Sequence, residues 1–182
     1  MVAFDSPLLP TGFSWRSLAQ LNPVQQAQLI SIEQASHHTP WSLAQFSSSV
    51  EAGHLAYAVT SNDEQVAAYA VLMPNADDWE LLNITVASNH RGQGIAQGVL
   101  TGLIATCRRA GAQAMLLEVR ASNVAAIALY TKLGFAHVTT RRAYYTAPIV
   151  KTAVDAQRQG REDALIFKLV FDEKTPAKAL AT

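Results

Sequence analysis

A glycine-rich turn in the middle of the chain is the first segment whose residue types suggest chemistry. The sequence RGQGIA at residues 91–96 sets Gly92 and Gly94 between an apolar run and an expected helix. Backbone N–H groups at a helix start lack intrahelical partners, and glycine lets a ligand approach them closely. Because the helix dipole adds partial positive charge, the turn is a candidate cradle for a pyrophosphate. It can equally be only a turn, and its spacing is not the G-x-G-x-x-G of dinucleotide-binding folds.

Glu118 places a carboxylate inside the apolar run MLLEVR. In a strand, Leu117 and Val119 would face one side of the sheet and Glu118 the other. Partial burial would raise the pKa of the Glu118 carboxyl group and make it a candidate general base. A structural ion pair with Arg120 or Arg142 explains the residue equally well.

Tyr130 and Asn123 belong to an expected helix at residues 123–133. A tyrosine inside a helix is usually part of the core, and an asparagine at a helix start is most simply an N-cap. Glu80 is a second carboxylate, which either assists Glu118 or is simply exposed. Taken singly, none of these residues fixes a function.

The order of these segments resembles that of one enzyme family. NITV, RGQGIA, LEVRASN and ALYTKLGF follow one another and closely resemble the GNAT superfamily of acetyl-CoA-dependent N-acetyltransferases. The similarity is nearest to the bacterial ribosomal-protein-alanine N-acetyltransferases, because Pro40-Trp41, RRAYY at residues 141–145 and GREDA at residues 160–164 also look like that subfamily. The resemblance covers residues 30–171.

The resemblance implies a role for each matching position. The backbone of residues 84–86 would bind the acetyl and pantetheine part of acetyl-CoA, and the turn would bind its pyrophosphate. Glu118 would be the general base, and Tyr130 the general acid near the cofactor sulfur. The implied cofactor residues are Ile84, Thr85, Val86, Arg91, Gly92, Gln93, Gly94, Ile95, Ala96, Gln97, Asn123 and Tyr130.

Two features depart from the family pattern. Ala96 stands where a glycine is frequent, and the polar connection at residues 146–159 is longer than usual. We expect that connection to be mobile without the acceptor and to line its entrance, since functional loops of this length are commonly lids or binding segments.

The resemblance implies that acetyl is transferred directly from acetyl-CoA to the N-terminal α-amine of a protein in a ternary complex. It also implies that the acceptor is a ribosomal protein with an N-terminal alanine. About a third of an α-amine is neutral at pH ~7.5, against ~0.1% of a lysine side chain. A single carboxylate with a modestly shifted pKa is therefore a better base for an α-amine than for a lysine. A lysine or small-amine acceptor is an alternative. So is a catalytically silent CoA-binding module, although the presence of both Glu118 and Tyr130 argues against it.

These sites require an α/β domain to position them. Apolar patterning and turn residues predict strands at residues 13–18, 54–60, 66–73, 79–86, 113–120, 136–145 and 163–171. They predict helices at residues 23–35, between Trp41 and Gly53, at 94–110 and at 123–133. The order β-α-α-β-β-β-α-β-α-β-β fits the GNAT fold, a mixed, mostly antiparallel sheet of about seven strands with flanking helices. We expect one domain over residues 1–172, with a loose arm at 1–12 and a flexible tail at 173–182.

Composition limits the partners. The formal net charge is zero, from 14 basic and 14 acidic residues, which speaks against direct contact with nucleic acid. The one cysteine, Cys107, excludes an internal disulfide and a cysteine-based zinc site. The five histidines show no metal-ligand spacing, and we interpret them as scattered surface or turn residues. Without a signal-peptide pattern or a membrane-spanning run, we expect a cytoplasmic monomer or weak dimer with no metal and no membrane contact.

Overall fold

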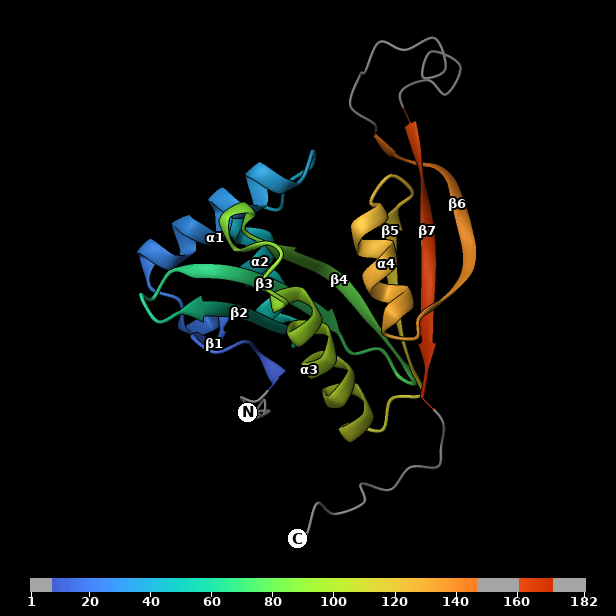
Figure 1. Ribbon diagram of the computed structural model, residues 1–182, viewed down its shortest axis with the longest axis horizontal. Helices are drawn as coiled ribbons and strands as arrows, with labels where there is room; N and C mark the ends of the chain where they lie inside the picture. The colour runs from blue at the N-terminus through green and yellow to red at the C-terminus, as the bar shows by residue number, and fades with distance from the viewer. Residues whose placement is uncertain (1–7, 147–160, 172–182) are drawn as a thin grey trace, which may run out of the picture.

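The computed structural model describes residues 8–146 and 161–171, in which seven strands form one sheet flanked by helices (Figure 1). The strands are β1 (Phe13–Ser17), β2 (Leu55–Ser61), β3 (Val66–Met73), β4 (Asp78–Val86), β5 (Ala114–Arg120), β6 (Ala136–Thr146) and β7 (Arg161–Val170). The α-helices are α1 (Pro23–Ser36), α2 (Leu43–Glu51), α3 (Ile95–Arg109) and α4 (Val124–Lys132). The predicted element order is confirmed, and the element ends agree to within two residues.

The sheet divides into two parts that separate at its centre. The strand order is β1-β2-β3-β4-β5-β7-β6, and each neighbouring pair is antiparallel except β4 and β5. This parallel pair extends only from Asp78 beside Ala114 to Leu81 beside Leu117, after which the strands diverge (Figure 1). On β5 the separation begins only after Leu117, because residues 114–117 are still held by the ladder to β4.

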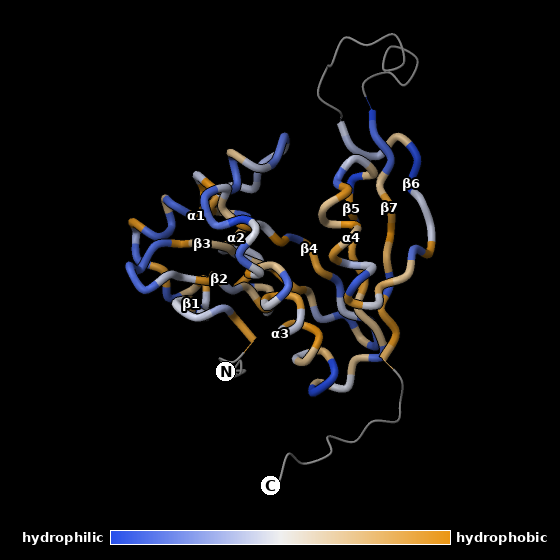
Figure 2. The backbone as a smooth tube through the Cα atoms, in the orientation of Figure 1, coloured by the Kyte–Doolittle hydropathy of each residue, from blue (hydrophilic) through white to orange (hydrophobic). Residues whose placement is uncertain are grey.

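Central strand β3 is buried on both faces and divides the core into two clusters. Ala68, Ala70 and Leu72 pack in the cluster that contains α3 residues, while Tyr69 and Val71 pack in the cluster that contains α1 and α2 residues. This is the period-two alternation of a strand applied to an apolar run. The hydrophobic colouring along β3 and α3 follows this interior (Figure 2).

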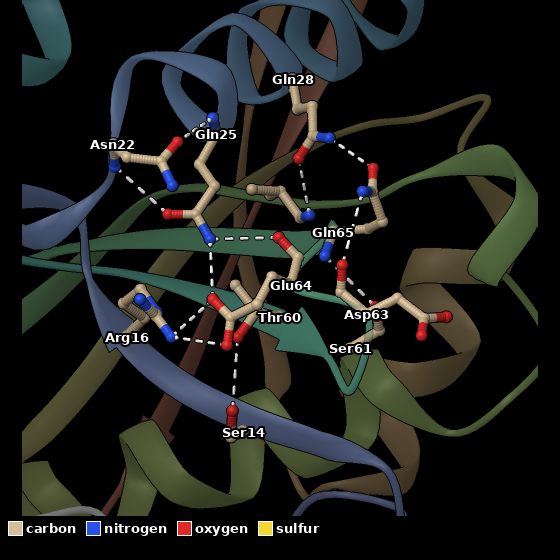
Figure 3. Close-up of polar contacts among 11 residues, drawn as sticks. Ser14, Arg16, Asn22, Gln25, Gln28, Thr60, Ser61, Asp63, Glu64 and Gln65 are labelled. Carbon is tan, nitrogen blue, oxygen red and sulfur yellow. Dashed lines mark hydrogen bonds and ion pairs between the residues drawn. The ribbon is translucent and has the colours of Figure 1, made fainter.

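Helix α1 is fixed at its N-terminal end to the β2–β3 turn. Asn22 and Gln25 form a capping box, and the buried Gln25 amide donates to the Glu64 carbonyl at 3.1 Å (Figure 3). Gln28 accepts a bond from the Val66 N–H at 3.0 Å. These contacts hold the helix whose other end reaches the candidate active site.

The N-terminal segment corrects our expectation of a loose arm at residues 1–12. Leu9 is buried in the main core. The Leu8 carbonyl oxygen lies so close to α3 that a Cβ built on Gly98 would be 2.2 Å from it. Residues 8–10 therefore pack on α3 at a place where only glycine leaves room for the backbone. Residues 1–7 lie outside the described part of the chain.

Two expectations fall on residues that the structure does not describe. The connection at 146–159 lies outside the described residues except for Thr146, and so does the tail at 173–182. The domain boundary at residue 172 therefore stays a prediction. Among the described residues, every helix is too short or too polar to span a bilayer.

Candidate active site

A cavity of about 590 Å³ lies where β4, the start of α3, and α4 meet. Every implied cofactor residue lines it except Gln93, whose side chain donates to the Asn89 carbonyl at 3.4 Å. The sequence had assigned no cofactor role to the remaining lining residues, which are Ser36, His37, His90, Leu100, Ala125, Ala126 and Leu129. The separation of β4 from β5 thus gathers the predicted cofactor residues around one space.

The start of α3 has the geometry of an anion site. Gly92 and Gly94 both adopt positive φ, at 76° and 81°, which accounts for glycine at both positions. No described side chain caps the helix at Gly94, whereas α1, α2 and α4 each have a side-chain cap. The first N–H groups of α3 therefore remain available to an anion at the positive end of the helix dipole.

Two cations stand on either side of this helix start. The Arg91 Nε donates to the Val86 carbonyl at 3.1 Å and its Nη2 to the Ser36 hydroxyl at 3.4 Å, so the guanidinium reaches toward α1. On the other side, the Lys132 ammonium donates to the Gln97 amide oxygen at 3.0 Å. Both charges add to the positive potential around the turn.

A second cavity, of about 380 Å³, lies between the α1–α2 connection, β4, β5 and β6. Its lining includes Glu118, Trp41 and Tyr144. It shares five lining residues with the first cavity, which are Ser36, His37, Ile84, Asn123 and Tyr130. The two cavities therefore meet at one place, where groups from two ligands could react.

Glu118 lines the second cavity with its side chain 17% exposed, and it forms an ion pair with Arg141 at 2.6 Å. Burial raises the pKa of its carboxyl group; Arg141 opposes that effect and the nearby Glu80 adds to it. The sequence named Arg120 or Arg142 as the ion-pair partner, and this was wrong: Arg120 instead pairs with Glu162 at 3.2 Å. The predicted upward shift of the Glu118 pKa is confirmed.

Tyr130 lies at the junction of both cavities and is 5% exposed. Its ring packs near Phe135 and Phe167, as expected for a core tyrosine. Burial, with a smaller effect of Tyr145, raises the pKa of its hydroxyl to about 12. The hydroxyl is therefore protonated at neutral pH and can supply a proton.

Asn123 serves as the N-cap of α4, since its side-chain oxygen accepts from the Ala126 N–H at 3.2 Å. This confirms the simpler interpretation of the residue. Asn123 also lines both cavities, so its cofactor role stays a prediction that the cap does not contradict.

A bulge in β6 places two tyrosines beside the second cavity. The β6–β7 register shifts between Arg141 and Tyr145, and Ala143 has a φ of 50°. The Asp163 carboxylate accepts from the Ala143 N–H at 2.8 Å and holds this strained conformation. Bulges often redirect side chains beside active sites, and here Tyr144 and Tyr145 both line the cavity.

A buried polar network behind the junction was missed from the sequence. Glu33, 1% exposed, accepts from the Tyr69 hydroxyl, from the Asn83 amide at 3.3 Å and from the Trp41 N–H at 2.8 Å. Its Oε2 lies 3.6 Å from the Nε2 of His37. We had interpreted His37 as a surface or turn residue. The spacing of Glu33 and His37, four residues apart at the end of a helix, was the one available signal.

Cys107 does not belong to this site. It is fully buried in the core of α3, and burial raises the pKa of its thiol to about 12. A thiol in that state is a poor nucleophile at neutral pH. In the part of the chain that the structure describes, no group of three or more His, Cys, Asp or Glu side chains could hold a metal ion.

The chain belongs to the acetyltransferase (GNAT) family, whose model matches residues 19–135. The [ribosomal protein bS18]-alanine N-acetyltransferase of Escherichia coli K12 is 39% identical over 138 residues, covering 76% of this chain and 86% of that protein. The crystal structure of the Escherichia coli ribosomal-protein-S18-alanine N-acetyltransferase has a TM-score of 0.74 at 33% identity, covering 92% of this chain and 99% of that one. The protein is an N-acetyltransferase.

A GNAT family acetyltransferase from Elizabethkingia anophelis, solved with acetyl-CoA bound, has the same fold. Its TM-score is 0.67 at 18% identity, covering 89% of this chain and 100% of that one. These comparisons confirm both the resemblance and the predicted fold class.

Proposed function

We propose that this protein transfers acetyl from acetyl-CoA to the N-terminal α-amine of a protein, and that a ribosomal protein with an N-terminal alanine is its acceptor. The observation that carries the proposal is the meeting of the two cavities at Ile84 and Tyr130. One cavity contains a cradle for a pyrophosphate, and the other contains a carboxylate with a raised pKa.

The first cavity fits acetyl-CoA. The uncapped start of α3 would bind the pyrophosphate, with Arg91 and Lys132 beside it. Among the described strands, none pairs with residues 82–86 of β4 on the β5 side. The backbone there could bind the pantetheine arm as it would bind a neighbouring strand. This arrangement would hold the thioester at the junction.

The residues at the junction would then perform the transfer. Glu118, directly or through water, accepts the proton that the amine loses as it attacks the thioester carbonyl. A backbone N–H near Val86 would stabilise the negative charge that develops on the carbonyl oxygen. Tyr130, whose hydroxyl is protonated at neutral pH, donates its proton to the departing sulfur.

The acceptor assignment rests on two supports. An α-amine titrates near ~7.7–8.0 and needs less help to lose its proton than a lysine near ~10.4. The Escherichia coli relative, at 39% identity, is named for acetylating the alanine of ribosomal protein bS18. A ribosomal-protein acceptor would place the reaction in the cytoplasm, and we expect a monomer or weak dimer without direct nucleic-acid contact.

A matched set of peptides tests the acceptor. The protein is incubated with labelled acetyl-CoA and an alanine-initiated peptide that carries one internal lysine, and with the same peptide blocked at its N-terminus. We expect label only on the peptide with a free α-amine. Label on both peptides to the same extent would favour the lysine acceptor. A third incubation with a panel of small amines tests the other alternative, which label on those amines alone would favour. No transfer to any amine would leave the silent CoA-binding module.

A further inference from the structure

The hydrogen bonds of the Glu33 network have a fixed donor-to-acceptor order, which the proposed chemistry does not use. The Asn83 amide nitrogen donates to Glu33, so the Asn83 oxygen is free to accept from the Thr85 hydroxyl, at 3.4 Å. With its proton directed to Asn83, Thr85 can only accept from the Nε2 of His37, at 2.8 Å. The proton of a neutral His37 therefore sits on Nε2.

The other ring nitrogen of His37 is then an unprotonated acceptor. No residue in the described ranges forms a hydrogen bond with Nδ1, and the side chain is 37% exposed. His37 also lines both cavities, so it borders the place where the amine and the thioester would meet. A carboxylate behind one nitrogen of an imidazole stabilises the imidazolium that forms when the other accepts a proton, and Glu33 stands in that position.

We propose that His37 is a second proton acceptor for the amine, with Glu33 as its positioning residue. This inference rests on the proposed function. It supplies a base on the α1 side of the junction, whereas Glu118 lies on β5 and is held by Arg141.

The proton transfer is balanced as follows. The amine nitrogen forms a bond to the thioester carbonyl carbon, and the carbonyl electron pair moves to oxygen. An α-ammonium group loses two protons on the way to an amide. Glu118 takes one of them, and the nitrogen bonded to the carbonyl carbon gives the other to the Nδ1 of His37. The carbon–sulfur bond then breaks, the electron pair leaves with sulfur, and the Tyr130 hydroxyl protonates it. The products are the amide and free CoA. The imidazolium returns its proton to the Tyr130 phenolate through solvent, and the proton taken by Glu118 is released to solvent.

Burial, more than the neighbouring charges, favours the neutral form of His37, which can accept a proton. Burial lowers its pKa; Arg120 of β5 and the adjacent His38 act in the same direction, and Glu33 of α1 opposes them. Glu118 of β5, together with Tyr130, Tyr144 and Tyr145 of α4 and β6, faces the same second cavity, and Arg91 reaches the neighbouring Ser36. A neutral His37 is the base form required for the step.

Two substitutions separate a base from a structural role. In His37→Gln the amide nitrogen can still donate to Thr85, but no basic nitrogen remains; His37→Ala removes both. We expect both variants to lower kcat by about 10- to 100-fold with the KM for acetyl-CoA within about threefold of wild type. His137→Gln is the matched control, because His137 also bonds a threonine hydroxyl, Thr140 at 3.0 Å, but lies on exposed β6. It should retain the wild-type rate.

Three results would overturn the proposal while leaving the proposed function intact. One is a His37→Gln enzyme with near-normal kcat, which would show a purely structural bond to Thr85. Another is a pH profile of kcat whose acid limb is the same in His37→Gln as in the wild-type enzyme. The third needs no variant: nitrogen NMR of the wild-type protein should show the Nε2–H tautomer near neutral pH, and an Nδ1–H tautomer would exclude the step. If the wild-type protein acetylates no amine, the proposed function fails instead.

Discussion

The Arg141 guanidinium lies 2.6 Å from the Glu118 carboxylate, so the proposed base is also half of an ion pair. Arg141 stands beside the ring of Tyr144 as well, 5.3 Å from its centroid. A base must be unprotonated to act, and the positive charge favours that form against the effect of burial. Arg141 therefore tunes the pH range over which Glu118 can accept a proton.

Arg141→Met should move the acid limb of the kcat/KM profile to higher pH. Removing the positive charge lets burial and Glu80 raise the Glu118 pKa further, so the fraction of active carboxylate falls first at mildly acidic pH. The rate at alkaline pH should stay near that of wild type. Arg142→Met is the control, because Arg142 is not among the residues that shift this pKa. If the acid limb of Arg141→Met stays at the wild-type pH, Arg141 does not influence the base.

Tyr130→Phe should lower kcat by roughly 10²–10⁴-fold, because the CoA thiolate would have to leave unprotonated. The melting temperature should change little, since the ring still packs near Phe135 and Phe167. Measuring kcat and melting temperature on the same preparation distinguishes an acid from a core residue. A destabilised variant with wild-type turnover would remove Tyr130 from the mechanism.

Gly94→Asp should raise the KM for acetyl-CoA by about 10-fold or more, because it sets a negative charge where the pyrophosphate would bind. The substitution also strains the backbone, since Gly94 has a φ of 81°. Gly53→Asp controls for that strain, because Gly53 has a φ of 84° and open space around it after α2. Calorimetry of acetyl-CoA binding should separate the two variants. Equal affinities of the two variants for acetyl-CoA would show that the pyrophosphate does not bind at this turn.

Gly98→Ala should destabilise the protein by about 1–3 kcal/mol, the usual cost of overpacking. The added Cβ would lie 2.2 Å from the Leu8 carbonyl, a backbone atom that cannot rotate away. A chain that begins at residue 11 tests this cause. In it the same substitution should be neutral or stabilising, because alanine favours a helix over glycine by ~1 kcal/mol. Equal destabilisation in both chains would mean that the clash lies elsewhere on α3.

The fold was predictable because its signals are local. β3 was predicted at its observed bounds, since an apolar run between two turn signals marks a buried strand without knowledge of its neighbours. The start of α3 was predicted equally well, because glycines directly before an apolar helical pattern mark a helix start without knowledge of distant contacts. The family motifs then assigned roles to residues that single positions could not.

What was missed depends on contacts between distant parts of the chain. His37 and Thr85 are 48 residues apart, and only the packing of α1 on the sheet brings them together. The Glu118 partner was assigned to the wrong arginine because it depends on the register of β6 against β7, which shifts between His137 and Thr139 and again beyond Arg141. The packing of Leu8 on α3 had no sequence signal beyond a glycine that is unremarkable within a helix.

The common wall of the two cavities has a kinetic consequence. Since Ile84 and Tyr130 border both spaces, each substrate contacts residues that the other also contacts. Initial rates measured against both substrates should therefore give intersecting rather than parallel reciprocal plots, because no covalent ping-pong intermediate links the half-reactions. A bisubstrate compound that joins CoA to an N-terminal peptide through the acetyl carbon would occupy both spaces at once. Such a compound should inhibit more strongly than either half alone, since its second half binds at a high effective concentration.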